Sequence, residues 1–209
     1  MGKRNEQRRQ RALARRKARR KEAKAARQSS SPNFSGSSLS LVSHYPVYEC
    51  RMPTRLFEMG IGNVVFARRL PLGIISMAVF LLDVFCLGVK DALWRTVEPG
   101  IYAEMIAKLA HDGPLENIDP ACARKLIEGA IEYAAQFGLR PHSDYKQAEK
   151  IFGDADAAAC PLSFKYGHGG KPFYVSGPND SPARARQVAS MLEQHCGPDG
   201  FEYVVTAEL

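Results

Sequence analysis

Four acidic residues are candidates for metal-dependent chemistry. Asp83 lies inside the apolar segment 74–85, where an unpaired carboxylate is costly to bury. Glu49 falls on a neighbouring predicted strand, and Asp91 or Asp144 could lie nearby. Grouped carboxylates can hold two divalent cations that activate water and stabilise a leaving phosphate oxygen. One hypothesis is therefore a metal-dependent phosphoesterase or nuclease that uses these residues.

A structural role for Asp83 is the alternative. At the edge or end of a sheet, its carboxylate would pair with Lys90 or Arg69. The histidines form no ligand pair, and the chain has no Cys-x-x-Cys pair. The loop GHGGKP at 167–172 lacks the spacing of a phosphate-binding loop and is typical of a hairpin turn. We therefore expect no metal and no cofactor, and no residue receives a definite catalytic role.

Two arginines stand at an unusual place in the last predicted helix. Arg184 and Arg186 fall in its first turn, where a cation opposes the positive end of the helix dipole. A bound anion would relieve this conflict, and so would a salt bridge to Asp180. The pair is a candidate for anion binding.

The strongest chemical signal is the charge of the N-terminus. Residues 1–27 contain thirteen Lys and Arg and two Glu, a net charge of +11. The other 182 residues contain 16 basic and 20 acidic residues, a net charge of −4. This asymmetry predicts a disordered basic arm on a separate domain. The expected function is non-enzymatic binding of phosphate backbone by the arm, with RNA or the ribosome as the expected partner. The candidate contacts are Arg8, Arg9, Arg11, Arg15, Arg16, Lys17, Arg19, Arg20 and Lys21.

The remaining composition limits the class of protein. Hydrophobic residues make up 45% of the chain and charged residues 24%, which is typical of a globular domain. Residues 28–46, rich in Ser, predict a flexible linker, so the domain is expected over 47–209. The arm has no apolar stretch like that of a signal peptide, and the five cysteines lie at least 36 residues apart. Free buried thiols and a cytoplasmic location are the expectation.

The elements that would position these residues form an α+β domain. Strands in an antiparallel meander are expected over 47–51, 62–69 and 74–85. Helices are expected over 91–97, 101–111, 121–137, 144–152 and 183–195. A hairpin is expected over 162–166 and 172–176, and a last strand over 201–206. Because strands and helices come in runs, an antiparallel meander and a hairpin packed with four to five helices is the predicted fold.

Two further interpretations concern the apolar segments. Residues 70–89 have the length of a membrane span, but Asp83, Pro71 and Gly73 leave too short an apolar run, so we expect no membrane contact. Segments 78–92, 129–145 and 165–180 are similar to blocks of an uncharacterised bacterial protein family. This resemblance implies a single domain and no known activity. A protein-interaction module with a solubilising arm is the remaining alternative function.

Overall fold

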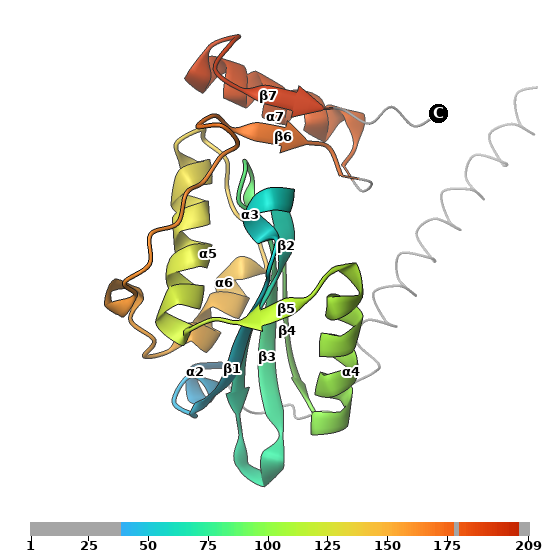
Figure 1. The fold of residues 1–209 in the computed structure, drawn as a ribbon, viewed down its shortest axis with the longest axis vertical. Helices are drawn as coiled ribbons and strands as arrows, with labels where there is room; N and C mark the ends of the chain where they lie inside the picture. Colours follow the sequence, from blue (N-terminus) through green and yellow to red (C-terminus); the bar gives the residue numbers. More distant parts are fainter. Residues whose placement is uncertain (1–38, 178–179, 205–209) are drawn as a thin grey trace, which may run out of the picture. The chain divides into compact units, whose positions relative to one another are not determined.

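Five antiparallel strands form the central sheet of the computed structural model, which describes residues 39–177 and 180–204 (Figure 1). The strand order is β4-β3-β2-β1-β5. The strands are β1 (Val47–Pro53), β2 (Ile61–Arg69), β3 (Ile75–Asp83), β4 (Gly88–Val97) and β5 (Leu115–Asn117). The sheet confirms the α+β class and the meander of the first three strands. The predicted basic arm lies outside the described residues.

The prediction of a helix over 91–97 is wrong. These residues belong to β4, which pairs with β3 from Ile75↔Val97 to Asp83↔Gly88. Ala, Leu and Arg in this segment favour a helix locally, but a full row of backbone hydrogen bonds with β3 outweighs that preference. The apolar stretch 70–89 is therefore part of a β-hairpin, and no described helix is long and apolar enough to cross a membrane.

One face of the sheet packs against α5 (Pro120–Ala135), α6 (Tyr145–Ala148) and the 3-10 helix η3 (Glu149–Phe152). The sequence predicts α5 because Asp119 can cap it and Pro120 suits its first turn. The Asp119 carboxylate accepts a hydrogen bond of 2.8 Å from the Ala121 N–H, which confirms the cap. The predicted helix over 144–152 is realised as α6 followed by η3.

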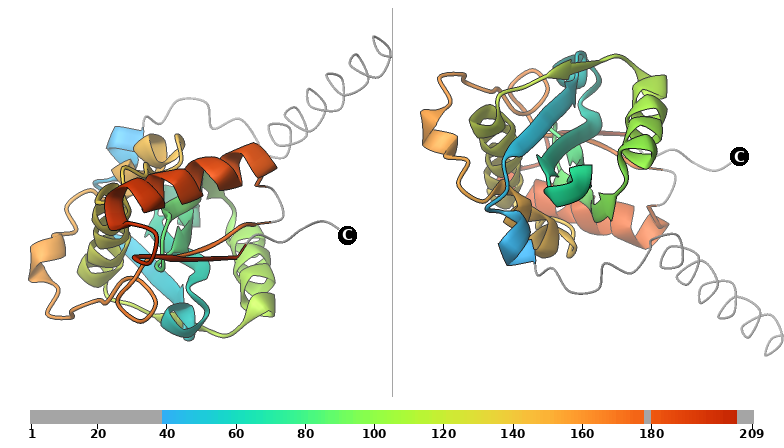
Figure 2. Two further views of the ribbon diagram at one scale, coloured as in Figure 1. Left: turned by 90° about the horizontal axis from the view of Figure 1, so that it is seen from above. Right: turned by 90° about the horizontal axis from the view of Figure 1, so that it is seen from below.

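The other face of the sheet is only partly covered. The helix α4 (Pro99–Leu109) and the 3-10 helix η2 (Ala110–Asp112) lie on this side, opposite α5 (Figure 2). Tyr102 of α4 is buried against Val65, Ala67 and Met77. Leu93 of β4 stays 39% exposed on this face, so α4 leaves the β4 side open.

The C-terminal part of the domain forms a second small sheet at one end of the first (Figure 1). This part of the chain contains β6 (Phe173–Val175), α7 (Pro182–Cys196) and β7 (Glu202–Val204), and β6 and β7 form the sheet. The two strands pair in parallel, and α7 buries Val188 and Leu192 beside Tyr174. The expected hairpin around the glycine loop is reduced to a single bridge between His168 and Lys171, and residues 162–166 form no strand.

Short helices complete the described residues. They are α2 (Leu39–Val42), α3 (Leu56–Met59), η1 (Pro71–Gly73) and η4 (Ala157–Ala159). The helix α2 lies within the predicted linker 28–46, and its Val42 side chain is buried. A segment rich in serine can therefore still contribute one apolar contact to the domain.

Arg68 is the largest buried polar side chain of the described sheet. Its Nε donates to the Ile151 carbonyl and Nη2 donates to the Phe152 carbonyl, both at 2.6 Å, and Nη1 donates to the Tyr45 carbonyl. Nη2 also lies 3.0 Å from the exposed Asp154 carboxylate. One guanidinium thus joins β2 to η3 and to the chain before β1.

Two of the five cysteines correct the expectation of free thiols. Cys122 of α5 and Cys160 after η4 form a disulfide, whereas Cys50 and Cys86 are free and buried and Cys196 is free and half-buried. The spacing of cysteines along the chain contains no information about this pair, because only the fold brings their Cα atoms to 4.9 Å.

Candidate functional site

Asp83 closes the turn between β3 and β4. Its Oδ1 accepts hydrogen bonds from the Phe85 N–H at 3.0 Å and from the Cys86 N–H at 2.9 Å. It lies at the end of a strand, as its structural interpretation expects, but Lys90 instead pairs with Asp180 at 3.2 Å. Arg69 stacks on the Tyr48 ring at 4.4 Å. The partners of Asp83 are therefore backbone amides.

The other predicted carboxylates have separate surroundings. Glu49 accepts from the Tyr102 hydroxyl at 2.7 Å and from the Arg51 guanidinium at 2.8 Å. Asp91 Oδ1 accepts from the Ala92 N–H at 2.8 Å.

His142 lies between two of these carboxylates. Its Nδ1 is 3.6 Å from Asp91 and 3.9 Å from Asp144. Within the described ranges, no three His, Cys, Asp or Glu side chains are grouped so as to hold a metal ion. The structure therefore brings Asp91 and Asp144 near one histidine and leaves Glu49 and Asp83 with other partners.

The two arginines at the start of α7 are exposed. Ser181 caps the helix by accepting from the Arg184 N–H at 3.2 Å, and the Arg184 guanidinium donates to Gln187 at 3.3 Å. Asp180 contacts Lys90 and the Gly177 N–H, so its carboxylate is engaged away from the arginines. An anion at this end of α7 stays a prediction. The nine candidate contacts of the basic arm lie outside the described residues.

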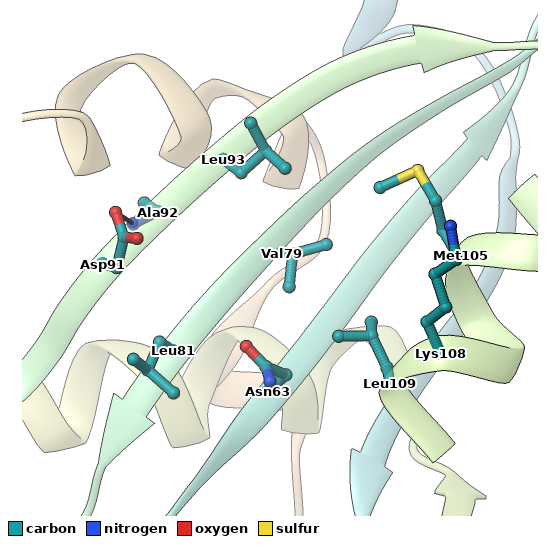
Figure 3. Close-up of a pocket in the computed structure, with 9 residues that line it drawn as sticks. All are labelled: Asn63, Val79, Leu81, Asp91, Ala92, Leu93, Met105, Lys108 and Leu109. Carbon is teal, nitrogen blue, oxygen red and sulfur yellow. Dashed lines mark hydrogen bonds between the residues drawn. The ribbon is translucent and has the colours of Figure 1, made fainter. Parts of the chain in front are cut away.

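Sequence reasoning missed a groove on the partly covered face of the sheet. Two cavities of about 300 and 350 Å³ lie beside α4 and share Asn63, Leu81 and Leu109 among their lining residues. Figure 3 shows the residues that line the first cavity. The cross-strand row Asn63–Leu81–Asp91 and the next row, which includes Val79 and Leu93, form its floor. The volumes of the two cavities fall in the lower range of small-molecule sites in proteins.

The helix α4 lines one side of the groove, and residues of α3 and β2 extend it at one end. Met105, Lys108 and Leu109 of α4 line one side of the first cavity and lie at the right of Figure 3. The second cavity continues to Met59 and Ile61, which are 61% and 42% exposed. Alternation along β2 could have identified this site, because it places the polar Asn63 on the same face as Val65 and Ala67.

Asp83 is expected to make stability depend on pH. Burial raises the pKa of this carboxyl from 3.8 to about 6, against the opposing effect of its hydrogen bonds with Phe85 and Cys86. The stabilising contribution of the protonated form is complete below pH 3.8 and is lost as pH rises through 6. Asp83→Asn stays neutral and keeps the accepting oxygen. As pH rises from 4 to 7, the free energy of unfolding of Asp83→Asn should therefore become larger than that of the wild type, by up to about 3 kcal/mol at pH 7.

Urea denaturation at several pH values measures this difference. Asp154→Asn is the control. The guanidinium of Arg68 lowers the pKa of Asp154, so the charged carboxylate stabilises the fold and the variant should lose stability relative to wild type as pH rises. A pH-independent difference between wild type and Asp83→Asn would contradict the assignment. Added Mg²⁺ should leave the melting temperature of the wild type unchanged, and stabilisation that disappears in Asp83→Asn would instead support the metal-dependent enzyme.

Comparisons with known proteins add no relative to this geometry. No family model, curated protein or solved structure matches the chain. The resemblance of segments 78–92, 129–145 and 165–180 to a bacterial family therefore contributes nothing to the assignment of function, which must rest on the residues themselves.

Proposed function

We propose that the protein is a non-enzymatic nucleic-acid-binding protein that contacts phosphate backbone, chiefly of RNA, through residues 1–27. The observation that carries this proposal is the charge of +11 on those residues against −4 on the rest of the chain. A dense run of Lys and Arg releases condensed counterions when it meets phosphates, and this release supplies affinity without sequence preference.

Features of the folded part support the assignment of binding to the arm and not to the domain. Several of its cations are already engaged, as in the Arg51–Glu49, Lys90–Asp180 and Arg124–Glu128 ion pairs. Two of its predicted catalytic carboxylates, Glu49 and Asp83, have structural partners, which favours binding over catalysis. A cytoplasmic location belongs to the same proposal, although the Cys122–Cys160 disulfide is of a kind that is rare in that compartment.

Binding is expected to weaken steeply with salt. If roughly half of the thirteen cations contact phosphates, the log–log slope on duplex should be about −5 to −6, from about −0.9 per contact. Replacing Arg15, Arg16, Arg19 and Arg20 together by Gln should flatten the slope by up to about 3.6, the equivalent of four contacts, and weaken all sequences alike. Filter binding on RNA and DNA of several sequences, from about 50 to 300 mM salt, measures both quantities.

Two variants control this experiment. Replacing the same four arginines by Lys preserves the charge and should preserve the slope. Deleting residues 1–36 should abolish binding while the melting temperature stays unchanged, because the described residues belong to a compact unit that begins at Ser37. Full affinity in the deletion variant would place recognition in the folded part, and a slope near zero for the intact chain would favour an arm that only solubilises an interaction module.

A further inference from the structure

We propose that the groove between α4 and the β3–β4 side of the sheet binds a small, uncharged, mostly apolar molecule that carries one amide-type group. This inference is independent of nucleic-acid binding by the arm. It rests on the shape of the groove, on one unpaired polar side chain in its floor and on the balance of charges along its walls.

The shape fits a small molecule. The two cavities share Asn63, Leu81 and Leu109, so a single occupant could extend from one into the other. The floor and walls are largely aliphatic, and Leu93, Ile61 and Met59 remain between 39% and 61% exposed around them. Covering such side chains removes apolar surface from water, which favours an apolar occupant.

Asn63 supplies the polar specificity. Its side-chain amide lies half-buried in the floor beside Leu81, and it makes no hydrogen bond within residues 39–177 and 180–204 (Figure 3). A carboxamide offers an N–H donor and a C=O acceptor side by side. A ligand group that presents an acceptor and a donor in the same arrangement would satisfy both, and an amide is the simplest such group.

The charges around the groove oppose a ligand with a net charge. Asp91 and Lys108 line the first cavity and carry opposite charges. Arg55 and Asp112 line the second, and Arg55 is already paired with Glu58 at 2.7 Å. A carboxylate ligand would be attracted by Lys108 but repelled by Asp91 and Asp112, and an ammonium ligand would meet the reverse. Because attraction and repulsion largely cancel, they do not offset the desolvation of a charged ligand, so a neutral ligand has the better electrostatic fit.

A matched set of probes tests this assignment on the full-length chain. Octanamide, its isostere 2-nonanone, octanoate and octylamine are titrated in turn while ¹H–¹⁵N spectra are recorded. Octanamide should produce saturable shifts at the Asn63 side-chain amide and at the backbone amides of Leu81 and Leu109. It should bind about tenfold more tightly than 2-nonanone, which lacks the donor, and more tightly than either charged probe.

Two substitutions assign the effect to Asn63. Asn63→Leu should remove the preference for octanamide over 2-nonanone while 2-nonanone still binds. Asn63→Asp should weaken 2-nonanone, because its carbonyl needs a donor that a carboxylate cannot supply. Asn117→Leu is the matched control, because Asn117 is an exposed strand residue outside the groove, and it should behave as wild type. The proposal is overturned if octanoate or octylamine binds best, if no probe gives saturable shifts in the groove, or if the preference for octanamide persists in Asn63→Leu.

Discussion

Removing the Cys122–Cys160 disulfide should lower the free energy of unfolding by about 4 kcal/mol. The bridge closes a loop with a sequence separation of 38 residues, and the chain-entropy relation for a loop of this length gives that magnitude. A loss of this size is a large part of the stability of an ordinary domain. Urea unfolding of the wild type with and without reductant measures it.

The structural consequence should be confined to one segment. Between η3 and β6 the chain contains only the short helix η4, and it is fastened to α5 by the disulfide and by three hydrogen bonds. These bonds run from Arg124 to the Ala155 carbonyl, from Lys125 to the Cys160 carbonyl and from Tyr166 to the Leu126 carbonyl. They remain when the bridge is removed, so the sheet and α5 should stay folded.

The double variant Cys122→Ala, Cys160→Ala is the control. Its unfolding should be insensitive to reductant, because the remaining cysteines are free. Titration of thiols in denaturant should find three in the oxidised protein and all five after reduction. Five free thiols in protein isolated from its cell under acid quench would show that the bridge does not form there, and would support the cytoplasmic location.

The sequence predicts the elements whose local signals and long-range contacts agree. The helix α5 has a capping aspartate, a proline in its first turn and apolar residues at the helical period, and all of these agree with the face that it buries. The strands β2 and β3 are recognisable because β-branched and aromatic residues are concentrated in them.

The missed strand and the missed strand pairing depend on partners that are distant in sequence. The strand β4 contains good helix formers, and its identity comes from pairing with β3. The parallel pairing of β6 with β7 joins segments separated by the whole of α7. The candidate sites also divide into those that local sequence identifies and those that packing creates. Asp83 stands out in the sequence as a carboxylate in an apolar run. The groove around Asn63 exists only once α4 packs beside the sheet.

Replacing Arg68 by Met should destabilise the domain by about 3–5 kcal/mol, since it leaves buried acceptors without a donor. The side chain of Arg68 is 2% exposed, and the carbonyl oxygens of Tyr45, Ile151 and Phe152 all accept from its guanidinium. Methionine can fill part of the volume but donates no hydrogen bond. Chemical denaturation at 25 °C, fitted for the midpoint and the slope, measures the loss.

The neighbouring arginine provides a matched control. Arg69 is exposed on the same strand and stacks on Tyr48, so Arg69→Met should cost no more than about 1 kcal/mol. Arg68→Lys keeps the charge but lacks the planar fork that reaches several acceptors at once, so it should lie between the two. Equal losses in Arg68→Met and Arg69→Met would show that the buried contacts of Arg68 add nothing to stability.

The backbone beside Arg68 supplies a second reason for a large effect. Gly153 has a φ of 52°, and a Cβ there would lie 2.3 Å from the Ser43 carbonyl oxygen and 2.8 Å from Arg68 Nη2. The glycine thus lets the chain after η3 come close enough for the Ile151 and Phe152 carbonyls to meet the guanidinium. Because this conformation and the arginine depend on each other, Gly153→Ala should also destabilise the domain, and combining it with Arg68→Met should cost less than the sum of the two single losses.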